Sequence, residues 1–309
     1  MRFDKKAIDL HMLFFKQWVR GKRPVVDVYI IKHKEEEKYM AFHNPQRIAE
    51  VAIETGAKKA VMPSGHALLL GFLGGAFIAL GFLLDIRVTA TLPKEWGSLG
   101  SLIGGAVFPL GLVLIVIAGG ELLTGNMMAL PIAVLAKRAT VGQLLRNWVL
   151  VLVSNFIGAI FVAYFFGHIV GLTETGPFLA KTVAIAQAKL DETFIQSLIS
   201  AVGCNWLVCL GVWLSFGADD ISGKMSAIWF PVMGFVAIGF QHVVANMFVI
   251  PAAIFAGHFT WGDYFANFVP VVIGNAIGGG VFVAFIYWIV NKSTLQTSIE
   301  EKQGMRKAG

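Results

Sequence analysis

Charged residues are scarce in this chain. Of its 309 residues, 14% are charged and 56% are hydrophobic. Uncharged apolar runs of about 18 or more residues recur, which is typical of transmembrane helices and not of a soluble core. We therefore predict an all-α integral membrane protein.

Cysteine is almost absent. Cys204 and Cys209 fall within one apolar run, and on a helix this spacing points their side chains in different directions, which excludes a disulfide between them. The sequence indicates no metal site and no cofactor. The start of the chain also lacks an apolar segment followed by a small-residue cleavage site, so no cleaved signal peptide is predicted.

The net charge of +6 arises mostly from the N-terminus and short loops. This distribution fits control of membrane topology better than binding of nucleic acid. Lys137, Arg138 and Arg146 lie between two predicted spans. Because basic loops stay on the cytoplasmic side, we predict a plasma-membrane protein with both termini in the cytoplasm.

Six spans are predicted from the apolar runs, at about 60–84, 97–137, 147–167, 193–216, 225–257 and 264–290. The second and fifth exceed the roughly 20 residues that one crossing needs, and Gly and polar residues interrupt each of them. Around this channel domain (60–291) we predict a cytoplasmic extension (1–44), an amphipathic helix at the membrane surface (45–59) and a cytoplasmic tail (292–309). The amphipathic helix begins at Asn44-Pro45, which has the residues of an N-cap and a first helical position.

A stretch of 13 residues occurs twice in related form. Residues 119–131 read GGELLTGNMMALP and residues 239–251 read GFQHVVANMFVIP, at an offset of 120. The same offset relates Asn155 to Asn275, while Leu80-Gly81 matches Leu210-Gly211 at an offset of 130. Each repeat holds three spans, and because three is odd, the second copy is inverted relative to the first. An inverted 3+3 repeat with two broken helices is the pattern of a transport pathway.

The breaks are the candidate functional site. A broken helix at membrane depth must line a cavity or be buried in protein, because lipid cannot satisfy its free backbone groups. We predict that half-helices restart at Asn126 and Asn246 with their N-termini toward the centre. The positive ends of their dipoles favour an anion there.

His242 lies in the second break, and it is the one His embedded in a long apolar run. Ionisable groups inside a bilayer are costly and usually functional. A reference pKa of ~6.5 allows a histidine to exchange a proton near neutral pH. Glu121 lies one position before Leu122, the counterpart of His242, and its role, structural or functional, stays open.

From about residue 45 to 291 the chain resembles the formate/nitrite transporter family. The motifs that carry the resemblance are Phe108-Pro-Leu-Gly-Leu112, Glu121-Leu-Leu-Thr124, Lys189 ahead of Thr193-Phe194, Asn205, Gly239-Phe-Gln-His242 and Ala245-Asn-Met-Phe248. The resemblance implies an aquaporin-like fold and a homopentamer with one pore in each protomer.

The resemblance also implies roles for single residues. The central histidine is His242, the loop threonine Thr124, the pore asparagine Asn205 and the vestibule lysine Lys189. The apolar constrictions are Phe108, Leu112, Leu122, Val208 and Phe235. One departure is Gln241, where many members have Glu directly before the histidine.

The function predicted from these features is a channel or transporter for formate and related small weak-acid anions, proton-linked through His242. Nitrite, hydrosulfide, acetate and lactate remain alternatives. From another class, an aquaporin-like channel for neutral solutes lacks its usual pair of Asn-Pro-Ala signatures here. A membrane enzyme with His242 as base lacks a nucleophile or a metal partner, so the sequence favours a protein that is not an enzyme.

Overall fold

The computed structural model describes residues 42–292. The chain divides into two units, Met1–His43 and Asn44–Gly309, and the fold below is that of the second unit. The predicted cytoplasmic extension (1–44) and tail (292–309) lie, except for their inner ends, outside the described residues.

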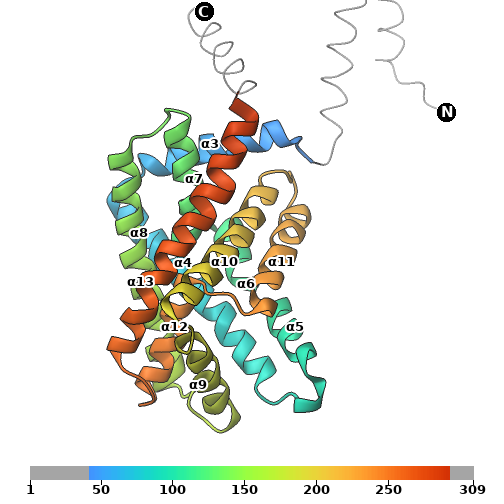
Figure 1. Ribbon diagram of the computed structural model, residues 1–309, viewed down its shortest axis with the longest axis vertical. Helices are drawn as coiled ribbons and strands as arrows, with labels where there is room; N and C mark the ends of the chain where they lie inside the picture. The colour runs from blue at the N-terminus through green and yellow to red at the C-terminus, as the bar shows by residue number, and fades with distance from the viewer. Residues whose placement is uncertain (1–41, 293–309) are drawn as a thin grey trace, which may run out of the picture. The chain divides into compact units, whose positions relative to one another are not determined.

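Six helical stretches are long and apolar enough to cross a bilayer, as predicted (Figure 1). They are α4 (Ser64–Thr89), the run of α5 (Ser98–Val107), α6 (Leu110–Val113) and η2 (Leu114–Gly119), α8 (Val141–Phe161) with η3 (Val162–Ile169), α10 (Phe194–Ser215), α11 (Ile221–Ile238), and α13 (Trp261–Ile277) with η4 (Gly278–Phe285). The other described elements are α3 (Pro45–Ala60), η1 (Lys94–Trp96), α7 (Leu123–Leu135), α9 (Pro177–Leu190) and α12 (Val243–Phe255).

The first span differs from its predicted bounds. Helix α4 continues to Thr89 and so includes Asp85 and Arg87, two charged residues that the prediction placed after the span. Arg87 is accommodated because its guanidinium lies 3.4 Å from the centre of the Phe178 ring, a cation–π contact. Asp85 turns into a cavity described below.

Helix α3 begins at Pro45, and the side chain of its N-cap, Asn44, accepts a hydrogen bond from the Arg47 N–H at 2.9 Å. Its apolar stripe packs against protein: Ile48, Ala49, Ala52 and Ile53 form one buried cluster with Met128, Ile132, Cys209 and Trp213. Helices α7 and α10 therefore pack on this stripe, and its place at the membrane surface stays a prediction.

Close glycine contacts join the spans in matching pairs. A Cβ on Gly158 of α8 would clash with the Phe72 carbonyl of α4, and a Cβ on Gly278 would clash with the Val202 carbonyl of α10. Gly158 and Gly278 are related by the offset of 120. Small residues let helix backbones approach closely in a membrane, so each repeat builds the same helix pair.

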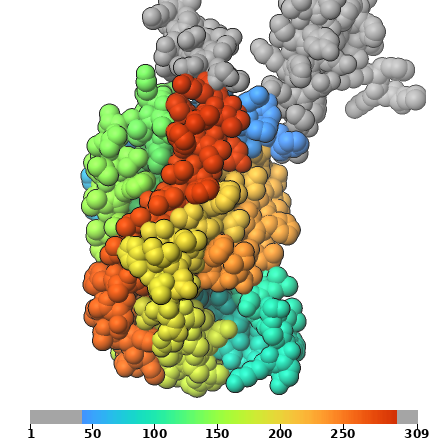
Figure 2. All heavy atoms as spheres, viewed as in Figure 1, coloured from blue at the N-terminus to red at the C-terminus, as the bar shows by residue number. Residues whose placement is uncertain are grey.

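The two short helices lie toward opposite ends of the helix bundle, α7 near α3 and α12 near α9 (Figure 1). Helix α9 was not predicted, because its sequence shows no feature of a helix other than its position between two predicted spans. Its residues and those of α5 meet at one end of the bundle (Figure 2), where they line a common cavity.

Candidate functional site

Both breaks turn at a glycine in the left-handed region. Gly119 has φ +99° and Gly239 has φ +91°, values that side-chain-bearing residues rarely adopt. Leu122 and His242 then have extended backbone before α7 and α12 begin. The glycines that the repeat aligns are thus the residues that allow the backbone to turn at each break.

The half-helices begin at Leu123 and Val243, three residues before the predicted starts. Asn126 and Asn246 occupy the fourth helical position, and their backbone N–H groups already donate to the Leu122 and His242 carbonyls. Their side chains form hydrogen bonds with neighbouring elements. In the sequence, an Asn used in this way looks the same as an N-cap.

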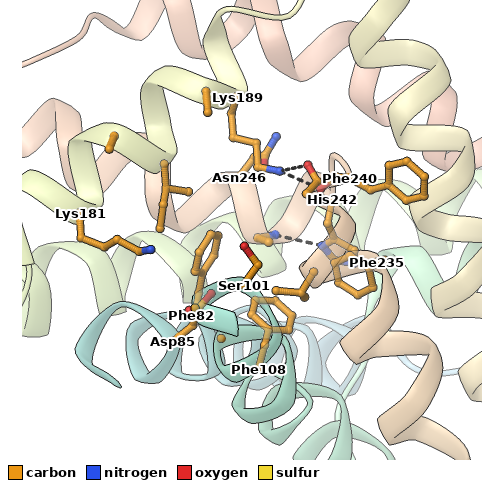
Figure 3. A pocket seen from close by; sticks show the side chains of 18 residues that line it. Phe82, Asp85, Ser101, Phe108, Lys181, Lys189, Phe235, Phe240, His242 and Asn246 are labelled. Carbon is orange, nitrogen blue, oxygen red and sulfur yellow. Dashed lines mark hydrogen bonds between the residues drawn. The ribbon is translucent and has the colours of Figure 1, made fainter. Parts of the chain in front are cut away.

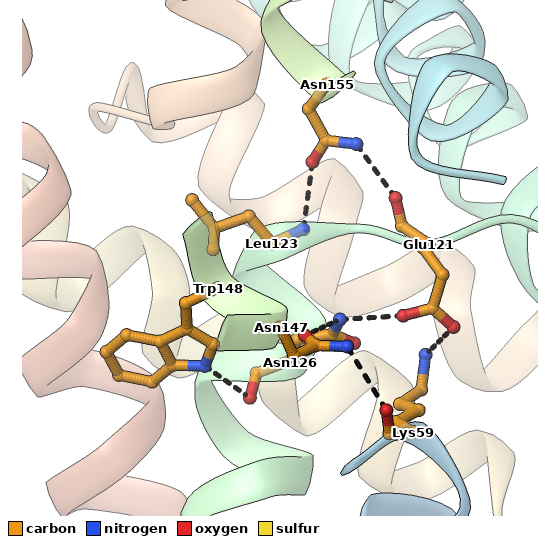
Figure 4. A network of polar contacts seen from close by, with 7 residues as sticks. All are labelled: Lys59, Glu121, Leu123, Asn126, Asn147, Trp148 and Asn155. Carbon is orange, nitrogen blue, oxygen red and sulfur yellow. Dashed lines mark hydrogen bonds and ion pairs between the residues drawn. The ribbon is translucent and has the colours of Figure 1, made fainter. Parts of the chain in front are cut away.

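Around the first break, Asn126 donates to Glu121 Oε2 at 2.7 Å and to Asn147 Oδ1 at 2.8 Å (Figure 4). Lys59 Nζ lies 2.5 Å from the other carboxylate oxygen of Glu121. Asn155 Oδ1 accepts the first N–H of α7, from Leu123, at 2.9 Å. Glu121 therefore has a direct ion pair and fixes the start of the half-helix.

The second break repeats this network with one change. Asn246 donates to Gln241 Oε1 at 2.7 Å and to Asn267 Oδ1 at 2.9 Å, and Asn275 Oδ1 accepts the Val243 N–H at 2.9 Å. Gln241 occupies the place of Glu121 and carries no charge.

Lys189 consequently has no carboxylate at hydrogen-bond distance among the described residues. Its ammonium donates to the carbonyls of Gly239 at 2.6 Å and Phe240 at 2.8 Å, at the C-terminal end of α11. Burial lowers the pKa of this ammonium from its ordinary value. The helix end offsets part of that effect, because its carbonyl dipoles favour a cation.

His242 and Thr124 bring the two breaks into contact. His242 Nε2 lies 3.0 Å from Thr124 Oγ1, and the imidazole stacks on Phe235 with ring centres 5.6 Å apart. His242 is also the N-cap of α12, because Nδ1 accepts the N–H of Ala245 at 3.0 Å. The structure therefore places these two predicted residues together at the middle of the fold.

Asn205 lies behind this contact and lines neither of the two cavities described below. It is fully buried on α10 and donates to the carbonyls of Thr124 at 3.2 Å and Asn275 at 2.7 Å. Asn205 thus joins the backbone of α7, next to the first break, to that of α13.

All five predicted constriction residues surround one small cavity of about 10 Å³. Its lining is Ile78, Phe108, Leu112, Leu122, Val208, Val232, Phe235 and His242. A volume of ~10–15 Å³ holds about one water molecule. This apolar chamber is closed to any larger solute in the present conformation.

A larger cavity of about 350 Å³, here called the vestibule, lies on the α9 side of the chamber (Figure 3). Lys181, Lys189 and Asp85 line it, and Phe108, Phe235 and His242 line both the vestibule and the chamber. These last three side chains therefore form the boundary between an open, charged cavity and a closed, apolar one.

Sequence reasoning missed Lys59, Lys181 and Asp85. The signal for Lys59 is its relation to Lys189 at the offset of 130 that joins Leu80-Gly81 to Leu210-Gly211. Each of the two lysines is the penultimate residue of its helix, α3 or α9. The repeat gives no such signal for Asp85 and Lys181, because only the folded chain brings these two residues into one cavity.

Comparison with known proteins matches residues 46–289 to the formate/nitrite transporter family. An uncharacterized transporter, YrhG, of Bacillus subtilis (strain 168) is 64% identical over 264 residues, covering 85% of this chain and 99% of that protein. The formate channel BtFdhC of Bacillus thuringiensis is 61% identical over 249 residues, covering 81% and 96%. A solved structure titled as a pentameric formate channel with formate bound has a TM-score of 0.62 at 32% identity, over 75% of this chain and 98% of that one.

Proposed function

The chain belongs to the formate/nitrite transporter family, and from this premise we propose that it conducts formate and related small weak-acid anions across the plasma membrane in a proton-linked manner. Members of this family are channels and transporters, and family membership therefore removes the alternative of a membrane enzyme. We further propose a homopentamer, since a related solved structure is a pentamer.

One observation carries the proposal: a cavity lined by two lysines ends on an apolar boundary that contains a single imidazole. Lys181 and Lys189 attract an anion into the vestibule. Beyond them, Phe108 and Phe235 present only ring surface, with centres 5.7 Å apart. An unneutralised anion loses its hydration there at a cost of several kcal/mol or more, whereas the neutral acid does not.

His242 supplies the polar contact at this boundary. Its Nε2 is oriented toward Thr124 and can donate a hydrogen bond to a small acid that replaces the hydroxyl. The predicted orientation, with both termini in the cytoplasm, places the vestibule on the outer side of the membrane. The chamber has to widen for an acid to pass, because its present volume of about 10 Å³ holds about one water molecule.

The experiment is uptake into proteoliposomes that contain the purified full-length chain. Labelled formate, nitrite, hydrosulfide, acetate and lactate are compared at two external pH values, with glycerol as a neutral solute. We expect formate to enter faster at the lower pH and glycerol not to enter. Equal entry of glycerol and formate, independent of pH, contradicts the proposal and favours a neutral-solute channel.

A further inference from the structure

Asp85 is a carboxylate in a cavity that otherwise attracts anions. It lies on α4, is 7% exposed, and projects into the vestibule together with Lys181 and Lys189 (Figure 3). The Thr89 hydroxyl, 3.3 Å from Oδ1, is the hydrogen-bond partner that the described chain offers this carboxylate. Among residues 42–292, no basic group lies within ion-pair distance of the carboxylate.

The charged groups around Asp85 come from two sides. Helix α9 contributes Lys181 and Lys189, and the second break contributes His242. The helices α5, α6, α12 and η2, which pack on α4, carry no ionisable residue. The ionisable residues of α8 and η3 (Arg146, Tyr164 and His168) do not line the vestibule. A permanent negative charge here repels the substrate, so electrostatic attraction gives no reason for a carboxylate at this place.

His242 does not hold a spare proton in this conformation. A backbone N–H is always a donor, so the bond from Ala245 shows that Nδ1 is unprotonated and that Nε2 carries the single proton. Binding a second proton at Nδ1 breaks the cap of α12, and losing the proton at Nε2 leaves an imidazolate. His242 thus orients the substrate, and the proton has to come from another group.

The two ends of the transport pathway also differ in where they hold a carboxylate. At the first break Glu121 is held in the ion pair with Lys59. At the second break the neutral Gln241 takes the place of that carboxylate. The acidic group at this end is Asp85, which lines the same cavity and has no direct ion pair within the described part of the chain.

We propose that Asp85 is the proton-exchange group of the vestibule for the weak acids of the proposed function. An anion drawn in by the lysines meets the protonated Asp85. The O–H bond on Asp85 breaks, an O–H bond forms on the anion, and the neutral acid moves past Phe108 and Phe235. The Asp85 carboxylate that remains is stabilised by Lys181 and Lys189 until a proton from the external water restores the acid.

The chemistry suits both directions of transport. Two carboxylic acids have similar reference pKa values, so the proton passes between them with little driving force either way. An acid arriving from the chamber can return its proton to the Asp85 carboxylate and leave as the anion. The two lysines suit this role less. An ammonium is a far weaker acid at its reference pKa, and the carbonyls of Gly239 and Phe240 favour the charged form of Lys189.

The test is Asp85→Asn in the full-length protein in proteoliposomes, with labelled formate uptake and internal acidification measured from pH 5 to 8. We expect uptake to fall roughly tenfold or more and to lose its pH dependence. The matched control is Asp191→Asn, which removes a carboxylate at the end of α9 that bonds Gln187 and does not line the vestibule. It should retain wild-type uptake and pH profile.

Four outcomes overturn the proposal. A rise in uptake by Asp85→Asn shows that Asp85 is only a repelling charge, and an equal loss at every pH shows a structural role. An unchanged profile shows no role in proton exchange. If Asp85→Asn does not assemble, Asp85→Glu is used, because it keeps a carboxylic acid. This variant has to retain pH-dependent uptake. If it assembles but its uptake no longer depends on pH, the proposal is overturned. Absence of formate uptake in the wild type refutes the proposed function instead.

Discussion

Phe235→Ala tests whether the apolar boundary selects solutes by size. Phe235 is 3% exposed and contacts both Phe108 and His242, and it lines the chamber as well as the vestibule. Truncation joins a chamber of about 10 Å³ to a cavity of about 350 Å³. Because a space of ~10–15 Å³ holds about one water, we expect several waters to enter the merged cavity and to hydrate an anion on its way.

Two results follow from this hydration. Lactate uptake should rise relative to formate uptake, and the uptake of both should depend less on a proton. A Phe→Ala change in a closed core destabilises a protein by ~3–5 kcal/mol. Since water fills the space left by Phe235, we expect a loss below about 3 kcal/mol.

The matched control is Ile228→Ala on the same helix. Ile228 is fully buried and lines neither cavity, so its truncation should cost ~2–5 kcal/mol of stability and leave the formate-to-lactate ratio unchanged. Uptake of both acids is measured beside thermal unfolding in detergent. If Phe235→Ala behaves as Ile228→Ala does, the ring is packing only and the reasoning about the boundary is refuted.

Three further predictions concern other parts of the site. His242→Phe should preserve assembly and reduce pH-dependent formate uptake, and identical uptake at every pH would remove His242 from the mechanism. Lys189→Ala should reduce uptake more at low than at high ionic strength, because a charge acting at distance is screened within ~8–10 Å at physiological salt; a salt-independent defect indicates a structural lysine. Asn155→Leu loses three interhelical or helix-start hydrogen bonds, which at ~0.6–1.7 kcal/mol each is roughly 2–5 kcal/mol. Unfolding of this variant is compared with that of Ser154→Ala, which loses bonds only within its own helix, and an equal effect of the two would contradict the estimate.

The repeat made the arrangement of this fold predictable. The same offset relates the glycines of the two breaks and the asparagines of the two helix pairs. Few other residue types fit these positions, because a left-handed turn favours glycine and the buried hydrogen bonds need an amide. The prediction of an all-α protein with six spans is confirmed. The starts of the half-helices were placed late, because a buried Asn that bonds a neighbouring helix looks the same in sequence as an N-cap.

The parts that sequence did not predict depend on distant contacts. Lys59 and Glu121 are 62 positions apart, and nothing local to either residue indicates the ion pair. Asp85 ended the first predicted span because a carboxylate is costly in lipid, but the vestibule lets it lie within the helix. Both cases show that a polar residue in an apolar run has to be interpreted with the cavity that it faces.

The apolar chamber also affects the membrane potential. The vestibule is large enough to be filled with conducting solution, so the potential across the bilayer falls mainly over the short apolar chamber beside it. Moving one elementary charge through ~100 mV involves about 2.3 kcal/mol, added to the penalty for leaving water, whereas an uncharged molecule is indifferent to the field. A cell that inserts many copies of this protein should therefore keep its membrane potential, although each acid molecule that enters still carries one proton with it.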